Sequence, residues 1–241
     1  MPLTNETTRV ENFLDIFNSI GAMTRQYFPE TKQHWSDDTS KRLAIRFYGF
    51  YQQPNRTYHG VAHPCNMHSA RYVIDDWCVR YDTAPILGRT AIVALYWMIM
   101  GHDIVIKFGQ APGWNEAESA RQTGEIMRRL GYPEQLVAFV ERGINATAKH
   151  TLDGIPEDEQ PTVAFLLDLD LMGLGQSAEG FAADTESIWL EYQPYLTRGA
   201  YDAGRKEWAA QFLERPRIYH TVYFADKEAQ AIANLRALAD S

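Results

Sequence analysis

Apolar side chains recur at three- and four-residue spacings along most of the chain, and this spacing limits the folds that it can adopt. Near the N-terminus the pattern runs through Phe13, Phe17 and Ile20, which is the period of an amphipathic helix. No comparable run alternates with period two, as a half-buried strand would. Similar helical stripes occupy residues 40–51, 66–80, 89–105, 115–130, 134–149, 161–175, 179–192, 202–213 and 226–239. The sequence therefore predicts an all-α fold of about nine or ten helices.

The stripes belong to one domain that spans residues 1–241. A chain of 241 residues can bury a sizeable core as a single unit. Glycine and proline separate the stripes, as in Pro112-Gly113 and in Gly131 with Pro133, which is where helices are expected to stop and start. The sequence contains no internal repeat and no low-complexity linker. Within residues 1–34 we expect an N-terminal helix that packs on the rest of the domain.

Composition places the chain among globular proteins and excludes some partners. The hydrophobic content is 45% and the charged content is 22%, which are ordinary values. The formal charge of -8 and the lack of a Lys/Arg cluster argue against binding to a nucleic-acid polymer. Two cysteines, Cys65 and Cys78, are too few to staple a domain of this size, so we expect small buried thiols in a reducing cytoplasm. No segment resembles a signal peptide or a membrane span, and homo-oligomerisation is left open.

The dipeptide His102-Asp103 ends an apolar run from Ala91 to Gly101. Within that run Tyr96, Trp97, Met98 and Met100 are expected in the core. Burying a polar group without a partner costs roughly 2–7 kcal/mol, and burying a charge costs more. The two side chains either satisfy each other or bind a metal ion, and a metal ion explains the pair most economically.

Two other segments supply further ligand types. His59 and His63 stand four residues apart, and Asp168 and Asp170 lie in a second apolar stretch that begins at Val163. Imidazole and carboxylate ligands without a thiolate suit Mn, Fe, Co, Ni or Zn. Three separated segments therefore predict a site for one divalent transition metal ion.

The order His63, His102-Asp103 and Asp170 resembles the metal-ligand pattern of the HD superfamily of metal-dependent phosphohydrolases. Surrounding phrases are similar to a poorly characterised branch of that superfamily, and the match runs from about Trp35 to the C-terminus. They are Pro54-x-Arg56-x-Tyr58-His59-x-x-x-His63, Asn115-Glu116-x-x-Ser119-Ala120, Asp168-Leu169-Asp170-Leu171, Gly204-Arg205, Ile218-Tyr219-x-Thr221 and Asn234-Leu235. The resemblance implies a helical HD-type bundle that hydrolyses a phosphoester or phosphoanhydride of a nucleotide or a related small phosphorylated metabolite. It also implies four metal ligands, His63, His102, Asp103 and Asp170.

Asp168 and Asp170 cannot both face the same ion, because two residues along a helix turn the side chain by about 200°. The resemblance favours Asp170 as the ligand. Asp168 then supports the ligand or accepts a hydrogen bond from another helix, and it is the alternative ligand. Pro64 disfavours a helical conformation at the residue before it, so we expect His63 at a helix start with Pro64 as the first helical residue.

His59 and Arg56 are expected outside the metal shell. His59 resembles the proton-donating histidine of cyclic-nucleotide phosphodiesterases, so it is either the acid for the leaving group, a phosphate contact, or a structural hydrogen-bond partner. Arg56 offers a bidentate fork for a phosphate, although an exposed loop arginine is more often only solvated.

Four other residues are candidates for substrate binding or catalysis. Lys149 could stabilise phosphoryl charge, or it could follow the ordinary preference of cations for a helix C-terminus. His150 and, more weakly, Arg205 are candidate substrate contacts. The family's phrase is Thr-Lys-x-His, whereas this chain has Lys149 directly before His150, one residue fewer. Either Lys149 or His150 could therefore face the site. Glu116 is either a general base or a capping residue.

The expected mechanism is hydrolysis by a metal-activated water. An ion on the four ligands would lower the pKa of a bound water and polarise a phosphoryl oxygen. Asp103 is expected to be a catalytic residue as well as a ligand. One alternative is an HD-type di-iron oxygenase, which needs two further histidines between Asp103 and Asp170, where only His150 is present. A two-metal phosphodiesterase is disfavoured by the same lack of histidine ligands, unless Glu116 replaces one of them. A non-catalytic nucleotide- or metal-binding regulatory domain is the third alternative.

Overall fold

The all-α prediction is confirmed. The structure is a computed structural model that describes residues 6–28, 30–31, 35–70 and 88–241, and in these residues it contains ten α-helices and no strand. The helices are α1 (Glu6–Tyr27), α2 (Asp37–Tyr51), α3 (Ala62–Ala70), α5 (Arg89–Gly101), α6 (Trp114–Arg129), α7 (Glu134–Ala146), α8 (Gln160–Asp170), α9 (Ala178–Tyr192), α10 (Arg198–Leu213) and α11 (Glu228–Ala239). Two short 3-10 helices, η2 (Leu171–Gly175) and η3 (Val222–Phe224), complete the described elements.

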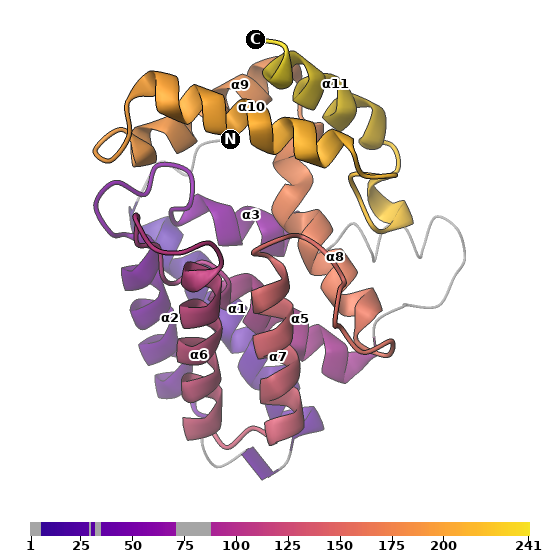
Figure 1. Ribbon diagram of the computed structural model, residues 1–241. Coiled ribbons are helices and arrows are strands. Elements are labelled where there is room, and N and C mark those ends of the chain that lie inside the picture. The colour runs from indigo at the N-terminus through magenta and orange to yellow at the C-terminus, as the bar shows by residue number, and fades with distance from the viewer. Residues whose placement is uncertain (1–5, 29, 32–34, 71–87) are drawn as a thin grey trace.

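The helices form a bundle with a second layer across one end. Helices α1, α2, α5, α6 and α7 make up the bundle, and α1 packs against α2 and α5. Helices α9, α10 and α11 lie across the end of the bundle, and α8 leads from the bundle to this layer (Figure 1). The site described below lies where the bundle and the layer meet.

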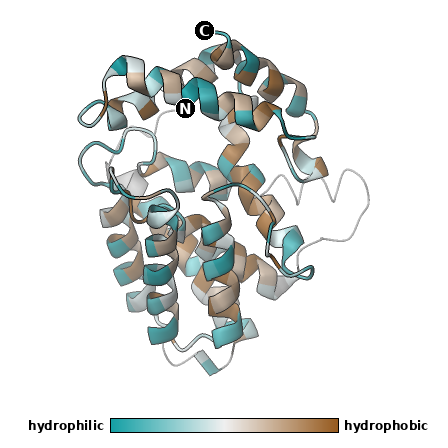
Figure 2. Ribbon diagram, in the orientation of Figure 1, coloured by the Kyte–Doolittle hydropathy of each residue, from teal (hydrophilic) through white to brown (hydrophobic). Residues whose placement is uncertain are grey.

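Helices α5 and α8 are buried because they are apolar on nearly every side. In α5 every residue from Val93 to Met100 is at most 2% exposed, and in α8 the buried run extends from Thr162 to Leu169. Brown, hydrophobic ribbon accordingly dominates α8 in Figure 2. The expected core residues Tyr96, Trp97, Met98 and Met100 are all buried. Since the two helices pack on each other, their C-terminal ends are brought together.

Local signals explain where the helices begin. The side chains of Ser36, Ser177 and Thr197 each accept a hydrogen bond from the backbone N–H three residues later, and so cap α2, α9 and α10. Before α6, Gly113 has a φ of 81°, a left-handed conformation that glycine adopts without a steric penalty.

Two of the predicted helix boundaries that differ from those observed lie at the site. Helix α3 begins at Ala62, so the expectation that Pro64 is the first helical residue is wrong by two positions. Pro64 is accommodated because it lies in the first turn, where a backbone N–H has no partner within the helix. Helix α5 ends at Gly101 rather than at residue 105, and a Cβ at Gly101 would lie 2.5 Å from Thr123 Oγ1 on α6. His102 and Asp103 therefore follow the helix in a turn.

Some of the sequence-based expectations concern residues that the structure describes only in part. Cys65 is buried, as expected, whereas Cys78 and residues 71–80 of the predicted stripe 66–80 lie outside the described residues. Across the described part of the chain, no helix is both long enough and apolar enough to span a bilayer.

Candidate metal centre

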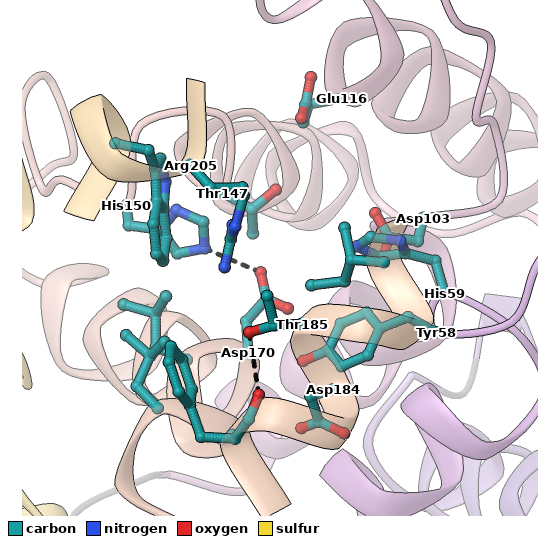
Figure 3. Close-up of a pocket in the computed structure, with 16 residues that line it drawn as sticks. Tyr58, His59, Asp103, Glu116, Thr147, His150, Asp170, Asp184, Thr185 and Arg205 are labelled. Atoms are coloured by element: carbon teal, nitrogen blue, oxygen red, sulfur yellow. Dashed lines mark hydrogen bonds and ion pairs between the residues drawn. The ribbon is translucent and has the colours of Figure 1, made fainter. Parts of the chain in front are cut away.

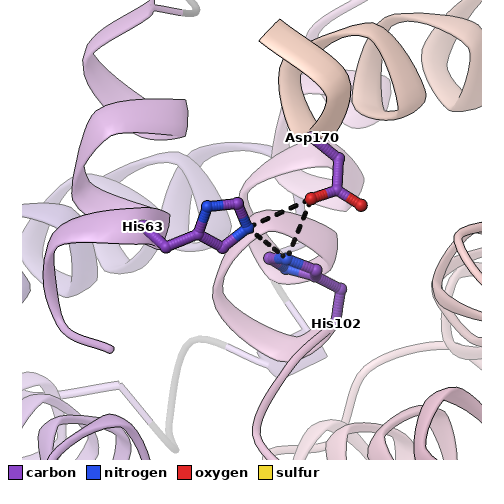
Figure 4. Close-up of side chains that lie close together, drawn as sticks. All are labelled: His63, His102 and Asp170. Carbon is purple, nitrogen blue, oxygen red and sulfur yellow. Dashed lines mark hydrogen bonds and ion pairs between the residues drawn. The ribbon is translucent and has the colours of Figure 1, made fainter. Parts of the chain in front are cut away.

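Three side chains from separate segments converge on one point. His63 comes from the first turn of α3, His102 follows α5, and Asp170 is the last residue of α8. His63 Nε2 lies 3.1 Å from His102 Nε2 and 3.0 Å from Asp170 Oδ1, and His102 Nε2 lies 3.6 Å from that oxygen (Figure 4). Around an ion with ligand bonds of about 2.1 Å, neighbouring ligand atoms lie about 3.0 Å apart at right angles and about 3.4 Å apart in a tetrahedron. The spacing therefore fits one transition metal ion.

Asp103 lies beside the two imidazoles. Its Oδ2 lies 3.2 Å from His102 Nε2 and 3.7 Å from His63 Nε2. The side chains of Asp103 and Asp170 keep 18% and 15% of their surface exposed, whereas the two imidazoles are buried. We refer to His63, His102, Asp103 and Asp170 as the His/Asp cluster. The carboxylates lie on its accessible side, where a ligand could approach.

Hydrogen bonds hold two of these side chains in a ligand-like orientation. His102 Nδ1 donates to the carbonyl of Ile99 at 3.0 Å, which leaves Nε2 to face the cluster. His150 Nε2 donates to Asp170 Oδ2 at 3.0 Å, so the carboxylate presents its other oxygen to the imidazoles. Such partners fix the orientation of metal ligands and raise their basicity.

The electrostatics of the cluster favour a positive charge at its centre. Burial alone would lower the pKa of His102, but Asp103 and Asp170 raise it to about 9. Burial is the largest influence on each carboxyl group and tends to raise its pKa. The charge of His102, together with hydrogen bonds and charges from the neighbouring histidines, outweighs it, so both pKa values are lowered. The two carboxylates therefore stabilise positive charge between them. A divalent cation would meet the same demand.

A cavity of about 160 Å³ opens over the exposed edge of the cluster. Asp103 and Asp170 line it together with His59, Glu116 and Arg205. In the view of Figure 3, Arg205 lies on one side of Asp170, and His59 and Asp103 lie on the other. The predicted ligand, acid, base and cation are therefore brought to one cavity.

Glu191 is a site residue that the sequence analysis did not identify. It is 1% exposed, and one carboxylate oxygen accepts from the backbone N–H groups of Tyr58 and His59 at 2.7 and 2.8 Å. The other oxygen accepts from His59 Nδ1 at 2.6 Å. A carboxylate within the apolar run Ile188-Trp189-Leu190-Glu191-Tyr192 was the signal that could have indicated it, since a buried charge needs partners.

The prediction that Arg56 binds phosphate is corrected. Its Nη1 donates to the carbonyl of Asp103 at 2.5 Å, and its Nη2 donates to the carbonyl of Ile104 and the side chain of Gln53, both at 3.2 Å. The guanidinium also lies 5.6 Å from the ring of Tyr51. Its Nε is buried without a hydrogen-bond partner among the described residues, but both Nη groups are engaged by the protein. Arg56 therefore fixes the backbone at the cluster and does not offer its two Nη groups as a fork to a ligand.

Two predicted substrate contacts also change role or place. His150 lines the cavity, but its Nε2 is engaged by Asp170, so it supports that carboxylate. Lys149 is exposed and lines a wider hollow beside the cavity, not the cavity itself. His150 also adopts a left-handed φ of 49°, a conformation that is uncommon for a residue other than glycine.

The structure also corrects Asp168 as the alternative metal ligand. Its Oδ1 accepts from the His220 N–H at 2.7 Å, and its Oδ2 accepts from the N–H and hydroxyl of Thr221 at 2.7 and 2.6 Å. Asp168 is fully buried. It therefore anchors the segment before η3 to α8, which matches the expected role of a hydrogen-bond acceptor between elements.

We predict that substituting Asp168 changes the stability of the protein, whereas substituting Asp170 changes its metal content. Asp168→Asn places an amide N–H₂ among three donors and should lower the free energy of unfolding by about 1–3 kcal/mol, while the metal content stays unchanged. Asp170→Asn should remove the metal. Denaturant unfolding and metal analysis of both variants test this. Metal loss in Asp168→Asn alone would exchange the two roles.

A comparison of the chain with protein-family models, curated proteins and solved structures found no match. The chemistry of the site is therefore inferred from its residues and geometry.

Proposed function

We propose that the protein is a metal-dependent phosphohydrolase that cleaves a phosphoester or phosphoanhydride of a nucleotide or another small phosphorylated metabolite. One observation carries the proposal: the His/Asp cluster lies at a cavity that also presents a histidine held by a buried carboxylate, His59, and a guanidinium, Arg205. The resemblance of the ordered motifs to the HD superfamily supports the same reaction. We further propose that the protein acts in the cytoplasm.

The His/Asp cluster would hold one divalent ion, for which Mn, Fe, Co, Ni and Zn all suit the donor set. When bound there, such an ion supplies an activated water near neutral pH and polarises a phosphoryl oxygen. The chain must then bind the phosphoryl group, orient it and provide a proton to the leaving oxygen.

His59 is placed to provide that proton. Glu191 accepts from Nδ1 and from the backbone N–H of the same residue, which fixes the ring and leaves Nε2 as the nitrogen that would face the substrate. Burial alone would lower the pKa of His59, but the hydrogen bond to Glu191 and the charge of Asp103 raise it. A raised pKa keeps the imidazolium populated near neutral pH, as a general acid requires.

Arg205 is placed to bind the phosphoryl group. Its guanidinium stacks 4.2 Å from the centre of the Trp208 ring, and its Nε is buried with no hydrogen-bond partner among the described residues. Burial lowers the pKa of Arg205, because desolvation disfavours the charge. An oxyanion in the cavity would satisfy the buried donor, and the planar fork suits a phosphate.

The decisive experiment is phosphate release by protein of known metal content. Apoprotein is loaded separately with each candidate ion, and release of phosphate, pyrophosphate or triphosphate is measured over nucleotides, phosphomonoesters and cyclic dinucleotides. We expect turnover with at least one substrate in the absence of dioxygen. Turnover that requires dioxygen would favour the oxygenase alternative, and a metal-loaded protein that is inert on the whole panel would favour a binding role.

We predict that Glu191→Gln impairs turnover without removing the metal. Glutamine replaces a carboxylate oxygen that accepts N–H bonds with an amide donor. The acid is weakened but not removed, so kcat should fall by about 10–100-fold, at or below the lower end of the range for general acid catalysis. Loss of the carboxylate also lowers the pKa of His59. Because the protonated form is the active one, the alkaline limb of the pH–rate profile should move to lower pH.

The matched control is Glu186→Gln, which makes the same change on the same helix at an exposed glutamate that pairs with Arg198. It should leave the profile in place. A Glu191→Gln variant with lower activity but an unmoved alkaline limb would show that Glu191 is structural and does not act through His59.

A further inference from the structure

A wide hollow adjoins the metal cavity. Its volume is about 760 Å³, against about 160 Å³ for the cavity, and both are lined by His59, Glu116, His150, Arg205 and Trp208. We call the wider space the outer hollow. The two spaces are therefore adjacent, so a ligand with one group at the His/Asp cluster would have its remaining part beside the outer hollow. A space of this size accommodates an organic molecule, because such ligand sites measure about 300–1,000 Å³.

The outer hollow is positively charged in a protein that is negatively charged overall. Lys149, Arg205 and Arg215 line it, and Glu116 is the one carboxylate among its described lining residues. The whole chain has 23 Lys and Arg against 31 Asp and Glu. A concentration of cations in a concave site attracts anionic groups and raises their local concentration.

None of these three cations forms an ion pair with a carboxylate in the part of the chain that the structure describes. The two Nη atoms of Arg215 donate to the carbonyls of His150 and Lys149 at 2.9 and 2.8 Å, and the guanidinium lies 3.8 Å from the centre of the Phe212 ring. By contrast, Arg128 and Arg142 pair with glutamates elsewhere. The charges in the outer hollow are therefore not neutralised by the described side chains.

The remaining wall is aromatic. Tyr192, Tyr201, Trp208 and Phe212 line the outer hollow, and Arg205 lies over Trp208 at the boundary with the cavity. Aromatic faces bind flat or apolar groups without needing a charge. The lining of the outer hollow thus combines aromatic side chains with cations that lack a carboxylate partner among the described residues.

We propose that the substrate carries two separate anionic groups. The scissile phosphoryl group lies at the His/Asp cluster and Arg205, an organic part lies along Trp208, and a second anion, a phosphate or a carboxylate, lies near Lys149 in the outer hollow. This inference rests on the proposed function and names the substrate class of the same site.

The test compares molecules that differ by one phosphate. A nucleoside 5′-monophosphate is paired with its 3′,5′-bisphosphate, and a hexose 6-phosphate with its 1,6-bisphosphate, each measured with metal-loaded protein. We expect the KM of the bisphosphate to be at least about tenfold lower in one pair, the gain typical of a charge-assisted hydrogen bond. In Lys149→Gln that ratio should fall toward one. In Lys41→Gln, which changes an exposed lysine of α2, it should persist.

A carboxylate in place of the second phosphate is tested in the same way with a matched phosphorylated acid and its amide. If no compound releases phosphate, the proposed function fails, and the dissociation constants of the same pairs, measured by calorimetry, still test two-anion recognition. Equal affinity for both members of every pair would overturn the inference. A bisphosphate preference that is unchanged in Lys149→Gln would overturn it as well.

Discussion

His102→Ala should empty the metal site and abolish hydrolysis. The imidazole is 1% exposed, and its Nε2 lies within 3.6 Å of ligand atoms on His63, Asp103 and Asp170. Its removal leaves two carboxylates and one imidazole without the ligand that lies between them. Since the metal contributes several kcal/mol of transition-state stabilisation, turnover should fall by at least about a thousandfold. Metal analysis after desalting should show a drop from about one ion per chain to near zero.

The matched control is His68→Ala, on the same helix as His63. The ring of His68 packs edge-on against Tyr96 at 4.8 Å, so this variant removes a partly buried imidazole that is outside the His/Asp cluster. It should keep the metal even if the protein becomes less stable. Full metal occupancy in folded His102→Ala would remove the basis for a metal centre at this point.

Local patterns in the sequence predict that His63, His102 and Asp170 come together, and these are the three side chains that could hold a metal ion in the structure. Two apolar runs become α5 and α8; His102 directly follows the first, and Asp170 ends the second. Helices this apolar must pack in the core and therefore against each other. His102, which directly follows α5, and Asp170, the last residue of α8, are then expected to meet. A spacing argument also separates Asp168 from Asp170, because a helix turns them to different sides.

The roles of the surrounding residues depend on contacts between distant segments, so sequence spacing does not predict them. Arg56 has a side chain of the type that binds phosphate, but the turn after α5 brings two carbonyl oxygens to its guanidinium. Glu191 lies 132 residues from His59 along the chain, and only the packing of α9 over the bundle makes them partners. His150 is turned toward Asp170 by a left-handed backbone conformation, which a sequence pattern rarely reveals for a residue other than glycine.

Arg205→Gln should cause the largest loss of activity among variants that keep the metal. Arg205 is the guanidinium that lines both the cavity and the outer hollow, and its buried Nε has no partner among the described residues. Removing a preorganised donor that faces developing charge costs about 10²–10³ in turnover, so kcat/KM should fall by about that factor. Arg205→Lys should recover only part of it, because an ammonium cannot form the bidentate contact.

Arg198→Gln is the control for that variant, since Arg198 lies on the same helix and its guanidinium also stacks on a tryptophan, 5.4 Å from the ring of Trp189. Arg198 is satisfied by Glu186 and Asp202 on the surface, and its loss should leave phosphate release unchanged. The comparison separates a stacked arginine that awaits an anion from one that already has its counter-ions. Equal activity of the Arg205→Gln and Arg198→Gln variants would mean that the phosphoryl group is bound without the buried guanidinium. Arg205 would then have a structural role only.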